Sequence, residues 1–227
     1  DMAPLQDELG RQFPEIVQNL TVEKLDDRDW SGTWRDSLVS MRFGSRLWVC
    51  PSGEDVPADP AVVIRLDPGL AFGTGTHATT AMCLEWLDGH APAGRTVIDY
   101  GCGSGILAIA ACKLGAACVH AVDIDPQALQ STRDNAARNG ITAGLTVQLP
   151  NDFAPESVDL VIANILANPL VELAGKLTGY LAPGGCIVMT GIMAEQAEDV
   201  MSAYRAAIDF SPPVLREEWV LLTGKKR

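Results

Sequence analysis

A glycine-rich loop follows an apolar segment in the middle of the chain and carries the strongest chemical signal in the sequence. The segment 96–100 has the pattern of a buried strand, and Gly101, Gly103 and Gly105 come directly after it at alternate positions. Glycine lets backbone approach a bound molecule more closely than a residue with a side chain allows. A helix is expected to begin at Gly105, so its unpaired backbone amides would face a polar ligand group. This arrangement predicts a binding site for a nucleoside-containing cofactor.

Asp123 and Ile106 narrow the kind of cofactor that this loop would bind. Asp123 lies eighteen residues after Gly105, at the end of the next apolar run. A carboxylate at that place can accept both ribose hydroxyls of an adenosine. Ile106 stands where a dinucleotide-binding loop would carry its third glycine or alanine. We therefore expect a cofactor without phosphates, S-adenosylmethionine, and keep a nicotinamide-dependent oxidoreductase as the alternative that Ile106 disfavours.

Asn164 is a further polar residue at the end of a predicted apolar strand, 158–164. Its side-chain oxygen could accept a hydrogen bond from a substrate N–H group. A turn residue that bonds to nearby backbone would give the same pattern. Asn164 is therefore a candidate for orienting a substrate, with a structural role as the open alternative.

The stretch 67–80 contains three glycines interleaved with small hydroxyl residues and leads into a predicted helix over about 78–87. We interpret it as a flap that closes over the cofactor and excludes water. Phe72 and Thr74 are its candidate cofactor contacts. A flexible connection that ends with Thr76 as a helix cap is the alternative interpretation.

The histidines and cysteines do not form a recognisable site. His77 could be a general base, although a lone histidine beside a helix start more often has a packing or hydrogen-bonding role. No histidine or cysteine grouping has the spacing of metal ligands, so no metal is predicted. The six cysteines include no Cys-x-x-Cys pair. They are therefore expected to be reduced thiols in a cytoplasmic protein.

Strands and helices alternate from residue 96 onward, and they determine where the polar residues would meet. Strands that are apolar at every position are buried on both faces, so helices must cover both sides of a mainly parallel sheet. The glycine loop, Asp123 and Asn164 would then share the carboxyl edge, where such sheets bind ligands. The predicted strands are 96–100, 117–123, 145–149, 158–164 and 186–190, with a closing hairpin at 214–217 and 219–223; the predicted helices are 105–114, 125–140, 170–181 and 194–208. Before residue 66 we expect a helix over 8–17 and strands over 20–25, 46–50 and 62–66.

Composition and charge exclude some classes of function. The chain has 227 residues and a formal net charge of −12. Long nucleic acid would require a basic face, so direct nucleic-acid binding is not expected. No apolar run is long enough to span a bilayer, and no membrane association is expected. An acidic protein suits a basic partner, although the charge is equally explained by solubility.

Four stretches together resemble one family of class I S-adenosylmethionine-dependent methyltransferases. They are Asp67–Thr80, Asp99–Gly105, Asp123-Ile124-Asp125-Pro126 and Asn164-Ile165-Leu166-Ala167. They are similar to the PrmA family, which methylates the eleventh protein of the large ribosomal subunit. The Phe-Gly-Thr flap combined with the Asn-Ile-Leu-Ala strand end is much more specific than the glycine loop alone. The resemblance covers the chain from about Leu20 to its end.

The resemblance implies the fold, the reaction and several site residues. The implied fold is α/β, a doubly wound, mainly parallel seven-stranded sheet whose last hairpin is antiparallel. The implied reaction is methylation of lysine side chains and an N-terminal α-amine of a large-subunit ribosomal protein, in the cytoplasm. Thr80, Gly101, Asp123 and Asn164 are the implied cofactor contacts, to which the loop adds Gly103. We further expect the Asn164 oxygen and nearby carbonyls to orient the acceptor amine.

Two departures from the family affect the expected domain organisation. Ala78 stands where the family usually has proline, which leaves the chemistry intact. The family also carries a small N-terminal α+β domain that recognises the substrate, and only its last part is expected here, in residues 1–26. A linker over 27–60 and a methyltransferase domain over 61–227 would follow. The alternatives are a methyltransferase for RNA or another protein, and a cofactor-binding fragment without turnover.

Overall fold

The computed structural model describes residues 39–51, 53–54, 62–66, 77–153 and 157–227. The chain divides into two compact units, Asp1–Thr33 and Trp34–Arg227, and all the described residues belong to the second. The predicted helix over 8–17 and strand over 20–25 lie outside the described residues, as do the flap residues Phe72 and Thr74. The proposed division into a recognition remnant, a linker and a methyltransferase domain stays a prediction.

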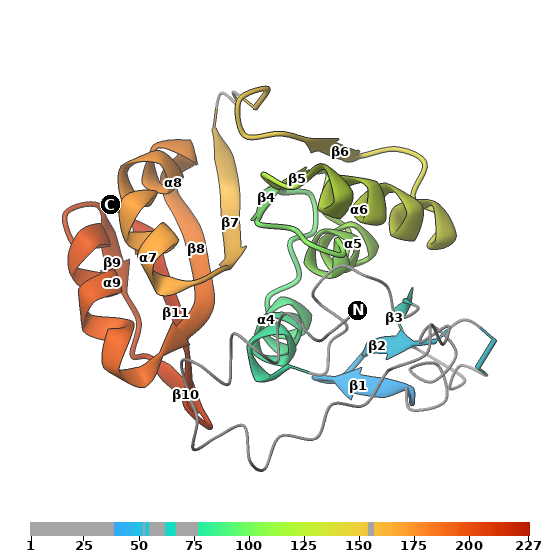
Figure 1. The fold of residues 1–227 in the computed structure, drawn as a ribbon, viewed down its shortest axis with the longest axis horizontal. Coiled ribbons are helices and arrows are strands. Elements are labelled where there is room, and N and C mark those ends of the chain that lie inside the picture. Colours follow the sequence, from blue (N-terminus) through green and yellow to red (C-terminus); the bar gives the residue numbers. More distant parts are fainter. Residues whose placement is uncertain (1–38, 52, 55–61, 67–76, 154–156) are drawn as a thin grey trace, which may run out of the picture. The chain divides into compact units, whose positions relative to one another are not determined.

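A central sheet forms the core of the described unit and confirms the predicted α/β class (Figure 1). Its strand order is β10-β11-β8-β7-β4-β5-β6. Strands β4 to β8 run parallel to one another, and β11 is antiparallel to both β8 and β10, as the closing hairpin predicted. The bounds are β4 Thr96–Tyr100, β5 Cys118–Val122, β6 Leu145–Gln148, β7 Val158–Asn164, β8 Leu181–Met193, β10 Val214–Arg216 and β11 Trp219–Lys226.

At the edge of the sheet beyond β11, two short strands together take the place of a single edge strand. β9 (Ile208–Phe210) pairs with the end of β11, while β10 pairs with its beginning. Pro212 and Pro213 lie between the two, and proline cannot donate to a strand ladder. The seven expected strand positions are therefore present, with the edge strand divided. Ile208 was predicted to end a helix and is instead the first residue of β9.

Helices cover both faces of the sheet, as expected for a doubly wound fold. Alternate strand residues enter two cores: Leu160 and Ile162 pack with α4, α5 and α6, whereas Val161 and Ala163 pack with α7, α8 and α9. In Figure 1, α7, α8 and α9 gather over β8 and β11, and α5 and α6 lie by β4, β5 and β6. The bounds are α4 Ala78–Gly89, α5 Ile106–Lys113, α6 Pro126–Arg138, α7 Ala167–Glu172, α8 Ala174–Tyr180 and α9 Ala197–Tyr204.

Two predicted helices differ from the observed ones. The predicted helix over 170–181 is two short helices, because Leu173 interrupts the helical path with ψ near 1°. Tyr204 Oη donates to the Leu170 carbonyl, the acceptor that a continuous helix would offer to Ala174. The predicted helix over 194–208 begins as a 3-10 turn and ends as α9 at Tyr204. No helix in the described part of the chain is both long and apolar enough to cross a membrane.

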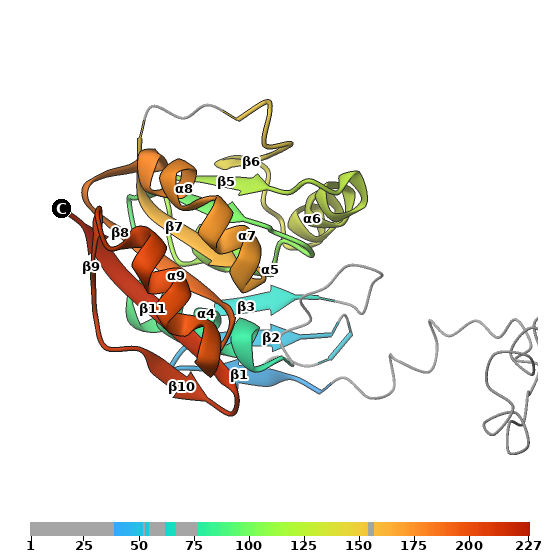
Figure 2. The same ribbon diagram turned by 60° about the vertical axis from the view of Figure 1, so that its left-hand side comes forward.

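A second, three-stranded sheet packs against α4 and α5 (Figure 2). It consists of β1 (Met41–Phe43), β2 (Leu47–Cys50) and β3 (Val62–Arg65), with β1 antiparallel and β3 parallel to β2. The strands β2 and β3 confirm predictions, whereas β1 was not predicted. β1 and β2 fall within the range 27–60 that the sequence analysis assigned to a linker.

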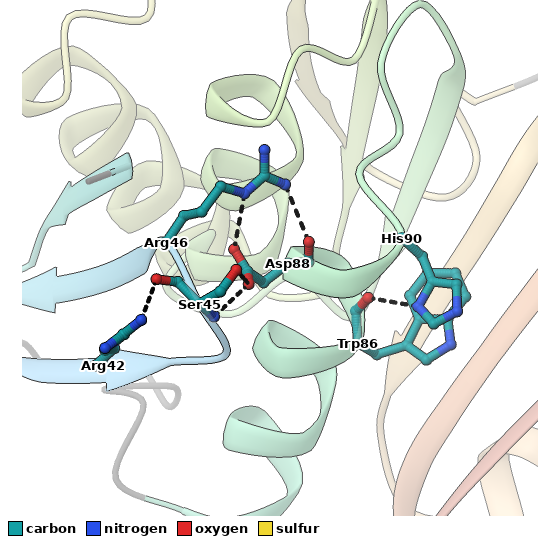
Figure 3. Close-up of polar contacts among 6 residues, drawn as sticks. All are labelled: Arg42, Ser45, Arg46, Trp86, Asp88 and His90. Atoms are coloured by element: carbon teal, nitrogen blue, oxygen red, sulfur yellow. Dashed lines mark hydrogen bonds and ion pairs between the residues drawn. The ribbon is translucent and has the colours of Figure 1, made fainter. Parts of the chain in front are cut away.

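A buried carboxylate, Asp88, ties the turn between β1 and β2 to the end of α4 (Figure 3). Its Oδ2 accepts from Ser45 N at 2.6 Å and Ser45 Oγ at 2.9 Å, and its Oδ1 accepts from Arg46 Nε at 3.3 Å. Arg46 Nη2 also donates to the Asp88 carbonyl at 3.0 Å. Gly44 is required in this turn, because a Cβ there would lie 2.4 Å from Asp88 Oδ2. The small sheet is thereby fixed to the helix that carries Thr80.

Replacing Asp88 by alanine is expected to lower the free energy of unfolding by about 2 kcal/mol, because it removes the buried carboxylate that accepts from Ser45 N, Ser45 Oγ and Arg46 Nε. Burial alone raises the pKa of Asp88, but the bonds from Ser45 and Arg46 outweigh it and hold the pKa below 3.8. The stabilisation is therefore present above pH 3.8 and disappears as pH falls through the lower folded-state pKa. Urea unfolding at pH 7 and at decreasing pH measures both effects. Asp134→Ala, on the exposed surface of α6, is the control and should change stability little.

Candidate active site

The polar residues predicted from sequence meet at the carboxyl edge of the central sheet. β4 lies between β5 and β7, so the strand order reverses its direction at β4. The glycine loop follows β4, Asp123 follows β5, and Asn164 is the last residue of β7. Open parallel sheets bind ligands outside such a switch point.

The glycine loop has a conformation that requires glycine. Gly101, Gly103 and Gly105 have φ values of 80°, 54° and 79°, in the left-handed region that other residues rarely adopt. A Cβ on Gly101 would also lie 2.2 Å from Ile165 Cγ2. The loop from β4 therefore packs directly against the residue that follows Asn164. Gly101 N donates to the Val122 carbonyl at 2.7 Å, which links the loop to β5 as well.

Side chains of α6 brace the loop from the other side, and sequence reasoning missed them. Thr132 Oγ1 donates to the Gly103 carbonyl at 3.1 Å, and Asn135 Nδ2 donates to the Ser104 carbonyl at 2.8 Å. Both are buried polar residues in a helix with an otherwise ordinary amphipathic pattern. Cys102 is buried beside Thr132, and burial followed by the charge of Asp99 raises the pKa of its thiol. This environment makes Cys102 a buried space-filling residue and not a nucleophile.

Asp123 holds the loop while keeping capacity for a ligand. Its Oδ2 accepts from Gly103 N at 3.0 Å, and its Oδ1 accepts from Asp125 N at 3.0 Å. A carboxylate has about four lone-pair positions, so two bonds leave acceptor capacity on both oxygens. Asp125 has a separate role, since its side chain caps α6 by accepting from Gln127 N at 2.8 Å.

Asn164 and Thr80 are in direct contact, although they are far apart in sequence. Asn164 Nδ2 donates to Thr80 Oγ1 at 3.2 Å, joining the end of β7 to the first turn of α4. Thr80 is buried, whereas Asn164 is only partly buried. The nitrogen of the amide is thus engaged, and its oxygen has no partner among the described residues. That oxygen is a free acceptor at the edge of the site.

Asp99 lies beneath the loop and is a candidate functional residue that sequence reasoning undervalued. It is buried in β4, and its Oδ2 accepts from Ala108 N at 2.9 Å, which caps α5 from below. Its Oδ1 is buried without a hydrogen-bond partner in the described part of the chain. Burial raises its pKa to about 7; the Ala108 bond opposes this shift and the charge of Asp123 adds to it. A carboxylate two residues before the first glycine of the loop was the sequence signal.

His77 caps α4 and packs on the C-terminal hairpin. Its Nδ1 accepts from Thr79 N at 3.4 Å and lies 2.7 Å from Thr79 Oγ1. Its ring makes an edge contact with Trp219, with ring centroids 5.0 Å apart. This supports the packing and hydrogen-bonding interpretation of His77, which takes the cap position that the sequence offered to Thr76.

The structure therefore brings together five of the seven predicted cofactor-binding residues. Thr80 contacts Asn164, Gly103 contacts Asp123, and Gly101 contacts the residue after Asn164. Phe72 and Thr74 lie outside the described residues. Their cofactor contacts, like those of the other five, stay predictions.

Comparison with known proteins connects this site to one family. The family described as ribosomal protein L11 methyltransferase (PrmA) matches residues 4–227. A protein named ribosomal protein L11 methyltransferase from Pseudomonas aeruginosa (strain LESB58) is 56% identical over 207 residues, which are 91% of this chain and 70% of the relative. One of the same name from Klebsiella pneumoniae (strain 342) is 56% identical over 207 residues, 90% of this chain and 70% of the relative.

A solved structure gives the same result. The ribosomal protein L11 methylase from Lactobacillus delbrueckii subsp. bulgaricus matches with a TM-score of 0.76 and 34% identity, covering 84% of this chain and all of that one. The fold of that methylase and the sequence matches over nearly all of this chain both agree with the sheet order and the glycine loop of a class I methyltransferase. The chain is thus a methyltransferase, and it belongs to the ribosomal protein L11 methyltransferase family.

Proposed function

We propose that this protein transfers methyl groups from S-adenosylmethionine to amino groups of ribosomal protein L11, both lysine side chains and the N-terminal α-amine. The observation that carries the proposal is the paired contacts at the switch point, Asn164 with Thr80 and Gly103 with Asp123. Family membership gives the substrate, since the relatives are named for L11. A ribosomal substrate implies action in the cytoplasm.

The residues present fit the proposed cofactor. Asp123 retains acceptor capacity suited to two ribose hydroxyls. The glycine loop exposes backbone without side chains, and the buried Oδ1 of Asp99 lies beneath it as an unused acceptor. Sulfonium and ammonium groups carry positive charge, which two nearby carboxylates favour. The cofactor supplies a methyl group already activated on sulfur, so the protein has to position the acceptor and exclude water.

Asn164 is suited to orient the acceptor amine. A lysine near its reference pKa of about 10.4 is mostly protonated at neutral pH, whereas the attacking amine must be neutral. A neutral amine donates through its N–H groups and keeps its lone pair for the methyl carbon. The free Asn164 oxygen can accept one of these N–H groups, and because Thr80 holds the nitrogen end, the oxygen stays directed toward the site.

Mass spectrometry of purified L11 incubated with this protein and S-adenosylmethionine tests the proposal. We expect added masses in multiples of one methyl group on lysine-containing peptides and on the N-terminal peptide. Ribosomal RNA offered in place of L11 should remain unmodified, consistent with the net charge of −12. L11 left unmodified by a protein that binds the cofactor would instead support a binding fragment without turnover.

A further inference from the structure

Thr190 is a buried polar residue beside Asn164 that the site as described does not use. It is the ladder partner of Asn164 across β7 and β8. Its side chain is completely buried, and Oγ1 has no hydrogen-bond partner among the described residues. Buried hydroxyls are nearly always paired, because an unpaired one destabilises the fold. An unpaired hydroxyl next to a site residue therefore calls for a functional explanation.

The Thr190 side chain lies on the same face of the sheet as the Asn164 side chain. Leu160 and Ile162 of β7 and Val188 of β8 all enter the core formed with α4. Side chains two residues apart on a strand point to the same face of the sheet. Asn164 comes two residues after Ile162, and Thr190 comes two residues after Val188, so both side chains lie on the α4 face. The bond from Asn164 to Thr80 of α4 agrees with this placement. Neighbouring strands lie about 4.8 Å apart, so a hydroxyl on one can reach an amide on the other.

The backbone around Thr190 is fixed against the strand end of Asn164. Gly191 has a φ of 84°, and a Cβ there would lie 2.3 Å from the Ile165 carbonyl oxygen. β8 therefore approaches the residue after Asn164 as closely as a glycine allows. With both backbones held, the Thr190 hydroxyl can approach the Asn164 amide only through a change of its own side-chain rotamer.

We propose that Thr190 is a positioning residue for Asn164: in the loaded site its hydroxyl donates to the Asn164 side-chain oxygen. The amide is then held at both ends, by Thr80 at nitrogen and by Thr190 at oxygen. An amide oxygen has two lone pairs, so the second still accepts from the acceptor amine. Without Thr190 only the Thr80 contact restrains the amide, so its oxygen is held less firmly in the orientation that the amine requires. The inference rests on the proposed function of Asn164.

Removing the hydroxyl without changing the shape of the side chain separates this role from a structural one. Thr190→Val is expected to lower kcat for L11 methylation about tenfold, the equivalent of one hydrogen bond. Because this hydroxyl has no partner among the residues that the structure describes, the variant should have an unchanged or higher Tm. Thr190→Ser should restore kcat to within about twofold of the original. Thr190→Ala is the second hydroxyl-free variant, and Thr223→Val, on neighbouring β11, is the matched control with unchanged kcat.

Two cofactor analogues test the same contact without the protein substrate. Sinefungin carries an amine where the transferred methyl group would be, whereas S-adenosylhomocysteine has neither methyl nor amine there. Thr190→Val should weaken sinefungin about tenfold by calorimetry and leave S-adenosylhomocysteine within about twofold. Full kcat in Thr190→Val, equal weakening of both analogues, or no rescue by serine would each overturn the role of Thr190. A wild-type protein that binds neither analogue would overturn the proposed function itself.

Discussion

Replacement of Asn164 by alanine is expected to lower kcat for L11 methylation about a hundredfold or more, the effect typical of losing one preorganised polar group at a reacting centre. The free oxygen of the amide is the only acceptor that the Asn164 side chain can present to an amine, because its nitrogen is engaged by Thr80. Its loss leaves the amine without the contact that directs its lone pair. Steady-state methylation of L11 by the variant measures the effect.

The affinity of Asn164→Ala for the cofactor product shows whether the variant has lost only the orientation of the amine or has a damaged cofactor site. The affinity for S-adenosylhomocysteine should change by less than about tenfold, because the glycine loop and Asp123 remain. Asn168→Ala is the matched control: Asn168 is four residues away and exposed in α7, and its loss should leave kcat unchanged. Full turnover by Asn164→Ala with unchanged cofactor affinity would contradict the proposed role.

The parts of the fold that could be predicted are those that local sequence determines. β4, β5 and β7 are mostly apolar, as expected of strands that are covered by helices on both faces. The start of α6 is set by Asp125 as cap and Pro126 as first helical residue, and Gly140, with a φ of 70°, follows its end. Each of these elements formed where the local signals placed it.

The helices and strands that differ from the sequence prediction depend on contacts with residues distant in sequence. β9 forms because its residues pair with the last residues of the chain, where a Cβ on Gly224 would lie 2.4 Å from Ile208 Cγ2. The break between α7 and α8 accompanies the bond from Tyr204 Oη to Leu170, 34 residues away. Local helix propensity gave no indication of either contact, since tertiary packing overrides it.

The same distinction applies to the site. Gly101, Gly103 and Asp123 could be proposed from spacing, because one βαβ unit places a loop and a strand end side by side. Thr80 came only from the family resemblance, since its contact with Asn164 spans 84 residues. Thr190 had no local signal at all. Its place beside Asn164 is a consequence of the β7–β8 register.

Replacement of Asp99 by asparagine is expected to stabilise the ligand-free protein above pH 7, by roughly 2 kcal/mol. The pKa of Asp99 is raised from 3.8 to about 7 in the folded state, chiefly by burial. Between these pH values the folded protein holds a proton that the unfolded chain has released, so its stability falls as pH rises through this window. A shift of this size corresponds to about 4 kcal/mol, part of which is lost because the new amide hydrogens have no buried acceptor. Urea unfolding from pH 4 to 8 measures the slope, which the variant should lack.

The carboxylate that destabilises the empty protein should favour the cationic cofactor. Ionised Asp99 attracts positive charge, so in the original protein the affinity for S-adenosylmethionine should rise from pH 6 to 8. S-adenosylhomocysteine lacks the sulfonium charge and should show a smaller rise. Asp99→Asn should remove the difference between the two ligands, and calorimetry across this pH range measures it.

A stability slope in Asp99→Asn equal to that of the original protein would show that another group titrates. If the difference between the two ligands persisted in the variant, the buried Oδ1 of Asp99 would not be the group that senses the sulfonium.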